Sequence, residues 1–381
     1  MCTSTVSATG GASQVKALVK PYGQVGLKYV TDAPIPDIGP RDVLVRVLAA
    51  SICGSDIHIY DSDPVFRERI GDGMTVGHEF CGQVERVGDQ VTTIAVGDIV
   101  AAESHVVCGT CYYCLNGVPH LCQEVAGIGF DRAGCFAEYI AIPAENAFLK
   151  PPELSLEVAA FIEPFGNALD TAMCVDLFGK SVLVTGLGPQ GLMALAVARA
   201  AGARRVIGTE VSAYRRRLAQ QMLELHGGAR QGAQDMILDA TQPDVAEQVF
   251  RATNGLGVDV VLEMSGHPAA IATAGTVLKH DGHLVALGLP GGAIEVDWSN
   301  HLVLKGCTFH GIYGRHLYQT WFTACELLES GAVQLEPLIT HRLPLERFDE
   351  GFQLLKRGEA AKVVLYPTAA EGLAQGVGSH G

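Results

Sequence analysis

The sequence predicts a two-domain α/β protein, in which a domain of short β-strands accompanies a doubly wound parallel sheet. The chain has 381 residues, more than one hydrophobic core usually organises. Between Val15 and about Pro151, short apolar runs are separated by turn signals, a spacing typical of a β-barrel or sandwich. Beyond Glu153, nearly continuous apolar strands alternate with helical segments, which indicates a parallel sheet buried on both faces.

The expected elements follow from these apolar runs in chain order. Strands are expected first at 15–19, 43–50, 95–103 and 136–142. The parallel strands are expected at 181–186, 204–211, 258–266 and 282–290. The first of them is followed by a helix at 191–203. We further expect a strand at 308–315, a helix at 317–331, and a helix followed by a strand within 337–367.

The simplest arrangement of these elements is one domain inserted into another. A dinucleotide-binding domain at 166–311 would interrupt a catalytic domain made of 15–165 and 312–367. Polar or Gly- and Ala-rich ends predict flexible tails at 1–14 and 368–381.

Composition and charge favour a compact protein with a small-molecule partner. Hydrophobic residues make up 48% and charged residues 18%, so intrinsic disorder is disfavoured as the main state. Forty-one acidic against 27 basic residues give a net charge of −14, which disfavours binding to nucleic acid or to an anionic membrane. No secretory signal and no membrane span is visible, so we expect a cytoplasmic protein.

The segment 181–191 predicts a phosphate-binding turn. Gly186, Gly188 and Gly191 have G-x-G-x-x-G spacing, directly after a strand and at the start of a helix. The first glycine permits a tight turn, the second lets the backbone approach a pyrophosphate, and the third lets helix and strand pack closely. The helix N-terminus supplies unpaired N–H groups and a favourable dipole for the anion.

An acidic residue at the end of the next strand indicates which dinucleotide binds. Glu210 lies 19 residues beyond Gly191, where a carboxylate accepts hydrogen bonds from both ribose hydroxyls and disfavours a 2′-phosphate. We therefore expect NAD rather than NADP. Of the arginines at 215–217, which could bind that phosphate, we interpret two as a solvated helix start and expect Arg215 to lie against the adenine or ribose. The alternative is an ordinary α/β turn without a ligand.

Four cysteines form a compact C-x2-C-x2-C-x7-C motif. They are Cys108, Cys111, Cys114 and Cys122. In a reducing compartment such a cluster predicts metal ligands rather than disulfides, and four thiolates suit a closed, structural zinc site. An iron–sulfur cluster is the chemical rival, but nothing else in the sequence indicates electron transfer. Free buried cysteines are the remaining alternative.

A second set of potential ligands is dispersed. Cys53 lies 25 residues before His78, which Glu79 follows directly. Cysteine, histidine and carboxylate together can hold a catalytic zinc and leave a fourth position open. Each residue also has a structural alternative, as a core thiol, a turn histidine and a buried ion-pair partner. The spacing does not decide between them, but a dinucleotide site and a zinc loop in the same chain favour the metal.

Several segments resemble the zinc-dependent medium-chain dehydrogenase/reductase family, over about Val15 to Pro367. They are SICGSDIHIY, VGHEFCG, CGTCYYC, GCFAEYIAIPAENAF, IEPFGNALDTA, EVSAYR, LEMSG and KGCTFHGIYGR. IEPFGNALDTA and GIYGR are most similar to the threonine-oxidising branch of that family. The resemblance implies a GroES-like β-barrel catalytic domain joined to a Rossmann domain.

The resemblance also implies the metal and proton-transfer residues. Two Zn2+ per chain are implied, one on the dispersed set and one on the four-cysteine loop. Ser55 and His58 would form a proton relay. Glu163 would be a nearby acid that assists the relay or exchanges with water as a zinc ligand. His105 is similar to a family histidine near the substrate, although a loop histidine bonded to backbone is equally consistent with its position.

The cofactor contacts are carried over in the same way. The NAD contacts implied are Gly186, Gly188, Gln190, Gly191, Glu210, Arg215, Leu287, Gly288, Leu289, Ile312 and Tyr313. Two positions depart from the family pattern: Ser55 replaces a threonine, and Gln190 places an amide where an aliphatic side chain is common.

The implied reaction is the oxidation of L-threonine to 2-amino-3-oxobutanoate, through a zinc alkoxide, the proton relay and hydride transfer to NAD. The loop after His58 lacks the tryptophans that relatives often have there. An alternative is therefore a polyol, aminocyclitol or vicinal-diol dehydrogenase on the same scaffold. A zinc-stabilised binding protein is a further alternative, which the acidic charge disfavours. The resemblance implies a homotetramer.

Overall fold

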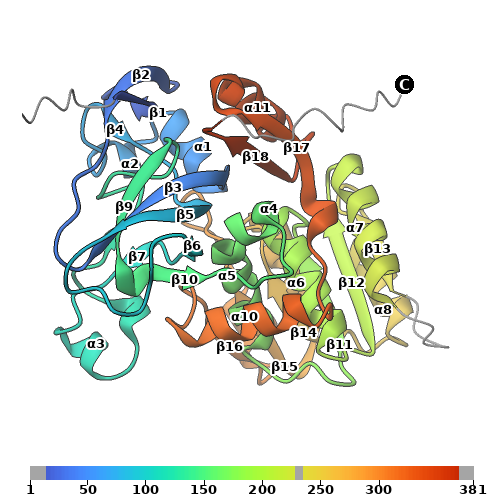
Figure 1. The fold of residues 1–381 in the computed structure, drawn as a ribbon. Helices are drawn as coiled ribbons and strands as arrows, with labels where there is room; N and C mark the ends of the chain where they lie inside the picture. The colour runs from blue at the N-terminus through green and yellow to red at the C-terminus, as the bar shows by residue number, and fades with distance from the viewer. Residues whose placement is uncertain (1–13, 228–234, 369–381) are drawn as a thin grey trace, which may run out of the picture.

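The computed structural model describes residues 14–227 and 235–368. The tails predicted at 1–14 and 368–381 lie outside these residues, apart from Gln14 and Thr368. Figure 1 shows the N-terminal strands on one side of the molecule, the parallel sheet on the other, and the C-terminal strands and helix between them. In the described part of the chain, no helix is long and apolar enough to cross a membrane.

The first part of the chain forms antiparallel sheets. The largest has the order β10-β6-β5-β3-β18-β17, with β9 also paired to β3. Its strands are β3 (Asp42–Ser51), β5 (Glu79–Val87), β6 (Ile99–Ala102), β9 (Tyr139–Pro143), β10 (Ala147–Leu149), β17 (Ile339–Pro344) and β18 (Lys362–Tyr366). Smaller sheets contain β1 (Gln14–Lys20), β2 (Lys28–Pro34), β4 (Met74–Thr75), β7 (His105–Val106) and β8 (Ala126–Gly127).

The C-terminal segment completes the largest sheet, in which only the pairing of β17 with β18 is parallel among the described strands. Strand β18 pairs antiparallel with β3, with Val364 opposite Ser51, and parallel with β17. Helix α11 (Phe348–Lys356) packs Phe348, Phe352 and Leu355 into the core that β3 and β5 also line. Strand β18 therefore lies beside β3, which ends two residues before Cys53.

The second sheet is parallel, with the order β13-β12-β11-β14-β15-β16. Its strands are β11 (Ser181–Thr185), β12 (Arg205–Glu210), β13 (Met236–Asp239), β14 (Val258–Glu263), β15 (Leu278–Ala286) and β16 (Thr308–Gly311). The order reverses direction between β11 and β14, which is the switch point where doubly wound sheets bind ligands. The predicted fold class is confirmed.

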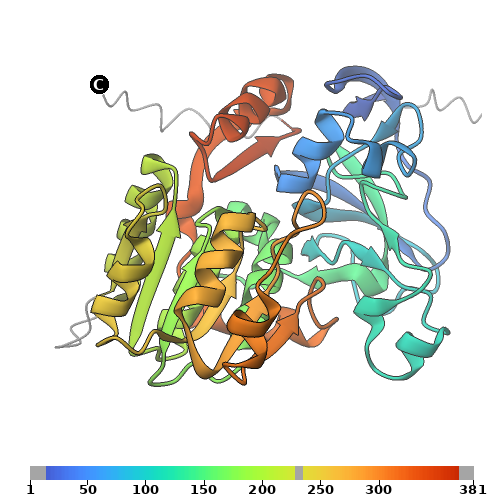
Figure 2. The same cartoon turned by 180° about the vertical axis from the view of Figure 1, so that it is seen from behind.

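Alternating side chains place a core on each face of the parallel sheet. Val182 and Val184 pack with one set of helices, α5 (Ile162–Met173), α6 (Pro189–Ala200), α7 (Ala213–Gly227) and α10 (Gln319–Glu329). Leu183 points to the opposite face and packs with α8 (Val245–Ala252) and α9 (Pro268–Val277). Figure 2 shows the helices of this second set lying across the sheet when the molecule is seen from behind.

The boundaries of several elements differ from those predicted. Strand β16 ends at Gly311 rather than at Arg315, so Ile312 and Tyr313 lie in the following loop. Strand β6 is limited to Ile99–Ala102 because the preceding residues form a turn, in which Gly97 has φ of 95°. Strand β13, which is half-buried at the sheet edge, was not predicted.

Candidate active site

The three dispersed ligands meet at the ends of elements from the antiparallel part. Cys53 immediately precedes the short helix α1 (Gly54–Tyr60), while His78 and Glu79 stand at the start of β5. Potential ligand atoms of these three residues all lie within 4.8 Å of one another. His78 and Glu79 are buried and Cys53 is half-buried, so the group is open on the cysteine side.

The donor set fits a zinc ion. Oε1 of Glu79 and Nδ1 of His78 are buried and make no hydrogen bond to the described residues, as expected of atoms that serve a ligand or its immediate support. Oδ1 of Asp56 lies 3.5 Å from that Nδ1. A carboxylate beside one ring nitrogen orients the histidine and leaves the other nitrogen to bind metal.

Asp56 also sets the protonation of His78. Burial favours the neutral imidazole, but the carboxylate of Asp56 and the thiol of Cys53 outweigh it and hold the pKa of His78 well above its usual range. The site is thus strongly attractive to positive charge. Asp56 is fixed in turn by the backbone N–H of Cys53, which donates to its Oδ2 at 2.9 Å.

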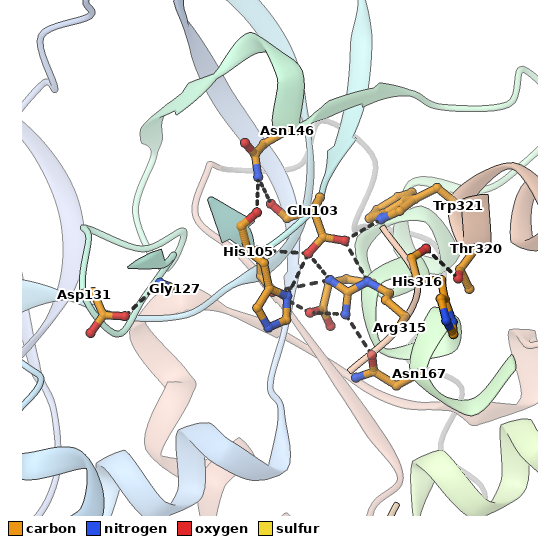
Figure 3. Close-up of polar contacts among 12 residues, drawn as sticks. Glu103, His105, Gly127, Asp131, Asn146, Asn167, Arg315, His316, Thr320 and Trp321 are labelled. Atoms are coloured by element: carbon orange, nitrogen blue, oxygen red, sulfur yellow. Dashed lines mark hydrogen bonds and ion pairs between the residues drawn. The ribbon is translucent and has the colours of Figure 1, made fainter. Parts of the chain in front are cut away.

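Figure 3 shows a network of ion pairs and hydrogen bonds around Arg315 and Glu103. The network includes Glu163, which interacts electrostatically with His78 of the ligand cluster. Nε of Arg315 donates to Oε2 of Glu103 at 2.7 Å, and Nη2 donates to Oε1 of the same carboxylate. Nη1 of Arg315 lies 2.8 Å from Oε1 of Glu163. Trp321 donates its indole N–H to Glu103 at 2.8 Å. Arg315 holds the pKa of Glu103 at about 2 against the effect of burial.

His105 and Glu163 both belong to this network, and the structure places them together with Glu103. Their potential ligand atoms lie within 4.8 Å of each other. Nδ1 of His105 is 2.9 Å from Oε1 of Glu103, so this ring is oriented by a carboxylate as well as by its loop. Glu163 accepts from Ser104 at 2.6 Å, and Arg315 lowers its pKa although burial raises it.

The predicted relay residues lie on helix α1. Ser55 is half-buried and His58 is exposed. Among the hydrogen bonds of the described residues, none joins Ser55 to His58. Nδ1 of His58 instead lies 3.2 Å from Oδ2 of Asp63, and its ring stacks on Phe66 with centroids 6.0 Å apart.

The glycine turn has the geometry that its spacing predicts. Gly186 has φ of 79°, and a Cβ added to Gly191 would lie 1.9 Å from the carbonyl oxygen of Gly186. Gly188 is the N-cap of α6, where an added Cβ would meet only Nη1 of Arg215, at 4.0 Å. The backbone at Gly188 is therefore open to a ligand at the helix N-terminus.

Glu210 lines a cleft at the carboxyl ends of β11, β12 and β14. The cleft measures about 510 Å³, and Gly186, Gly188, Arg215 and Ser265 also line it. The carboxylate of Glu210 accepts hydrogen bonds from the backbone N–H groups of Leu187 and Ser212.

The arginines after this strand differ in their contacts. Arg216 is engaged by Asp239 at 2.9 Å and by backbone carbonyls, and Arg217 is exposed. Nε of Arg215 is buried and makes no hydrogen bond to the described residues. Arg215 also lines the cleft.

The remaining predicted cofactor residues are on neighbouring loops. The N–H groups of Leu287 and Gly288 both donate to the carbonyl of Glu263, which fixes their turn after β15. Leu289 and Tyr313 are exposed, and Ile312 donates to the carbonyl of Ala286 at 2.9 Å. Oε1 of Gln190 is buried without a hydrogen bond to the described residues.

The four-cysteine loop forms a second, closed ligand set. The four sulfur atoms lie within 4.8 Å of one another. Backbone N–H groups of Thr110 and Cys111 point at Sγ of Cys108, and they lower the pKa of this thiol to about 6. Sulfur atoms that accept amide hydrogen bonds are stabilised as thiolates, which is the state that binds zinc.

Sequence reasoning missed several functional neighbours. It assigned no role to Asp56, Glu103, Arg315 or Lys362, all of them charged and buried. Arg315 and Glu103 are 212 positions apart, and no local spacing indicates such a pair. The one available signal was the location of Asp56, three residues after Cys53 in the first turn of a helix.

Comparison with known proteins gives consistent matches along the chain. The family model described as alcohol dehydrogenase GroES-like domain matches residues 39–152, and the one described as zinc-binding dehydrogenase matches residues 189–330. The chain is 43% identical over 356 residues to L-threonine 3-dehydrogenase of Bacillus subtilis (strain 168), covering 93% of this chain and 99% of that protein.

Solved structures match over the same extent. A zinc-binding dehydrogenase from Sinorhizobium meliloti 1021, bound to NADP, is 29% identical with a TM-score of 0.81, covering 93% of this chain and 100% of that one. The 2R,3R-butanediol dehydrogenase of Bacillus subtilis is 27% identical with a TM-score of 0.81, at the same coverage of 93% and 100%.

Proposed function

The chain belongs to the zinc-dependent medium-chain dehydrogenase family, and we propose that it oxidises L-threonine to 2-amino-3-oxobutanoate with reduction of NAD. The observation that carries the reaction class is the open ligand set of Cys53, His78 and Glu79, in a chain that also forms a dinucleotide cleft. The identity with a relative named L-threonine 3-dehydrogenase supports the choice of substrate.

The ligand set suits an alcohol as the substrate. A zinc ion held by Cys53, His78 and Glu79 would supply a Lewis acid that favours ionisation of a hydroxyl group near neutral pH. The protein residues orient that alcohol and remove its proton. The half-buried side of Cys53 leaves room for the substrate, whereas the buried His78 and Glu79 close the opposite side.

Ser55 and His58 are proposed to carry the proton to solvent. The hydroxyl of Ser55 would accept the substrate proton and pass it toward His58, which is exposed and can release it to water. Asp63 supports this role because it lies beside Nδ1 of His58 and leaves Nε2 available.

Glu163 contributes a fixed negative charge rather than an acid. Arg315 and Ser104 hold its carboxylate, and its lowered pKa keeps it ionised at neutral pH. Its part in the relay would then be electrostatic support. His105, oriented by Glu103, is proposed to border the substrate.

NAD is proposed as the preferred dinucleotide. Glu210 places a negative charge in the cleft where a 2′-phosphate would lie, and Arg216 is already paired with Asp239. Gly186, Gly188, Gln190 and Gly191 would contact the pyrophosphate, and Arg215 the adenosine. The loops with Leu287, Gly288, Leu289, Ile312 and Tyr313 would border the nicotinamide half.

We also propose two domains, a structural zinc, a cytoplasmic location and a homotetrameric assembly. A catalytic domain of 15–165 and 312–367 around a domain of 166–311 is supported by the pairing of β18 with β3. A structural zinc on the four cysteines is supported by their shared geometry. A cytoplasmic location is supported by the free state of all the described cysteines. We also propose a homotetramer, by family likeness.

A polyol or vicinal-diol substrate is the second candidate. It is favoured by the structural match to a butanediol dehydrogenase. Purified enzyme with NAD should be offered L-threonine, L-serine, 2,3-butanediol and sorbitol while NADH absorbance is followed. The highest kcat/KM is expected with L-threonine. A much higher value with either polyol would overturn the choice of substrate while leaving the reaction class intact.

A further inference from the structure

The two carboxylate oxygens of Glu79 have different surroundings. Oε2 accepts hydrogen bonds from Nζ of Lys362 and from the hydroxyl of Ser51. Oε1 is buried and has no partner among the described residues. We propose that Lys362 and Ser51 are positioning residues, which hold Oε2 and so commit Glu79 to bind zinc through Oε1 alone. This inference rests on the metal centre proposed above.

The arrangement is built by three neighbouring strands. Ser51 on β3 lies opposite Glu79 on β5, and Val364 on β18 lies opposite Ser51. Lys362 precedes Val364 by two residues, so its side chain leaves the same face of the sheet. The C-terminal strand thereby delivers a cation to a ligand 283 positions earlier in the chain.

Burial restricts Lys362 to its contact with Glu79. Lys362 is 2% exposed, and Glu79 and Ser51 are fully buried. A lysine in such a place needs a charged partner, and Glu79 is its only ion-pair partner among the described residues. Lys362 also lies 5.6 Å from the ring centroid of Phe161, which limits where its ammonium group can go.

Lys362 places a positive charge among the buried acidic side chains at the site, Glu79 and Asp56. Without Lys362 and Ser51, Oε2 would be free to bind the ion as well. A second oxygen would occupy the position that a substrate hydroxyl needs in a four-coordinate site.

A purely structural ion pair makes a different prediction. Loss of Lys362 would then lower the stability of the fold and leave the affinity for zinc unchanged. A positioning role instead predicts a change confined to one of the two zinc sites. Supporting residues around a metal ligand typically change metal affinity by about 10- to 100-fold.

Zinc competition on the full-length holoenzyme separates the two. Wild type, Lys362→Met, Ser51→Ala and the control Lys356→Met, which removes a surface pair with Asp61, are titrated with a chromophoric chelator. We expect one zinc per chain to be released only at about 10- to 100-fold higher chelator concentration in Lys362→Met, because the freed Oε2 adds a ligand atom and a positive charge is lost. Ser51→Ala should show a smaller shift of the same zinc, and the control none. Unchanged release in the first two variants, or an equal shift of both zinc ions, overturns the proposal.

One further variant, Cys53→Ser, and the absorption spectrum of bound cobalt complete the experiment. If Lys362→Met does not fold, Ser51→Ala decides, since it removes a single hydroxyl. Cobalt placed in the site of Cys53, His78 and Glu79 should absorb visible light less strongly in Lys362→Met, because a second Glu79 oxygen raises the coordination number. An unchanged cobalt spectrum contradicts binding through one oxygen. If Cys53→Ser keeps two zinc ions, the proposed centre itself is wrong. If that variant loses one while release from Lys362→Met is unchanged, the positioning role alone fails.

Discussion

Arg315 and Glu103 form a bidentate ion pair in which both side chains are fully buried, although 212 positions separate them in the chain. Glu103 follows β6 in the antiparallel part, and Arg315 lies between β16 of the parallel sheet and α10. The pair therefore ties the two parts together beside the candidate active site. It also orients His105 on one side and Glu163 on the other.

Arg315→Met is expected to destabilise the enzyme by about 3–5 kcal/mol, because it leaves two buried carboxylates without their cation. Urea unfolding followed by fluorescence measures the loss. Arg251→Met removes an exposed pair with Asp244 and should cost less than about 1 kcal/mol. If both variants lose the same free energy of unfolding, the buried network stabilises the fold no more than an exposed ion pair does.

Glu103→Gln is expected to flatten the acid limb of the stability profile. The pKa of Glu103 is about 2 in the folded protein against an ordinary value of 4.5, so its ionised form favours folding. That contribution is fully present above pH 4.5 and is lost as the pH falls toward about 2. The free energy of unfolding should thus fall more steeply in wild type than in the variant across this range. If the free energy of unfolding falls equally steeply with pH in both proteins, the low pKa of Glu103 is contradicted.

Glu210→Gln is expected to weaken NAD and relax the discrimination against NADP. A hydrogen bond to a charged group contributes about 1.5–3 kcal/mol, so kcat/KM for NAD should fall by roughly 10- to 100-fold. Steady-state kinetics with both dinucleotides measure the change. Arg217→Ala alters an exposed residue of the same segment and should leave NAD kinetics unchanged. If Glu210→Gln still prefers NAD over NADP as strongly as wild type does, Glu210 does not determine the choice of cofactor.

Cys111→Ser is expected to remove one zinc per chain and lower the melting temperature, because a closed thiolate site contributes directly to folding. Metal analysis and thermal unfolding on the same sample measure both effects. Cys174→Ser, at an exposed free cysteine, is the matched control and should behave as wild type. Two retained zinc ions and an unchanged melting temperature would refute the structural zinc.

Features that depend on local spacing could be predicted from the sequence. The turn at Gly186 to Gly191 and the four-cysteine loop each use residues close together in the chain, so their geometry follows from motif and backbone chemistry. Cys53, His78 and Glu79 were an intermediate case, in which spacing alone did not exclude structural roles. Only the sheet register shows that their ligand atoms meet.

The supporting charges could not be predicted. Lys362 and Arg315 reach their partners across 283 and 212 positions, through strand pairing and domain packing that no periodicity encodes. Strand β16 was predicted too long for a related reason. Apolar residues continue to Tyr313, but the N–H of Ile312 makes the last contact with β15, and the chain then turns toward the antiparallel part.

Cys53 is expected to help hold the metal at which L-threonine is oxidised. The most direct measurement is NADH formation from L-threonine by wild type and by Cys53→Ser, with zinc content and NAD binding determined on the same samples. We expect turnover by wild type, and in Cys53→Ser the loss of one zinc and at least about a 100-fold lower rate, with NAD binding retained. Full activity and two zinc ions in Cys53→Ser would contradict this role of Cys53.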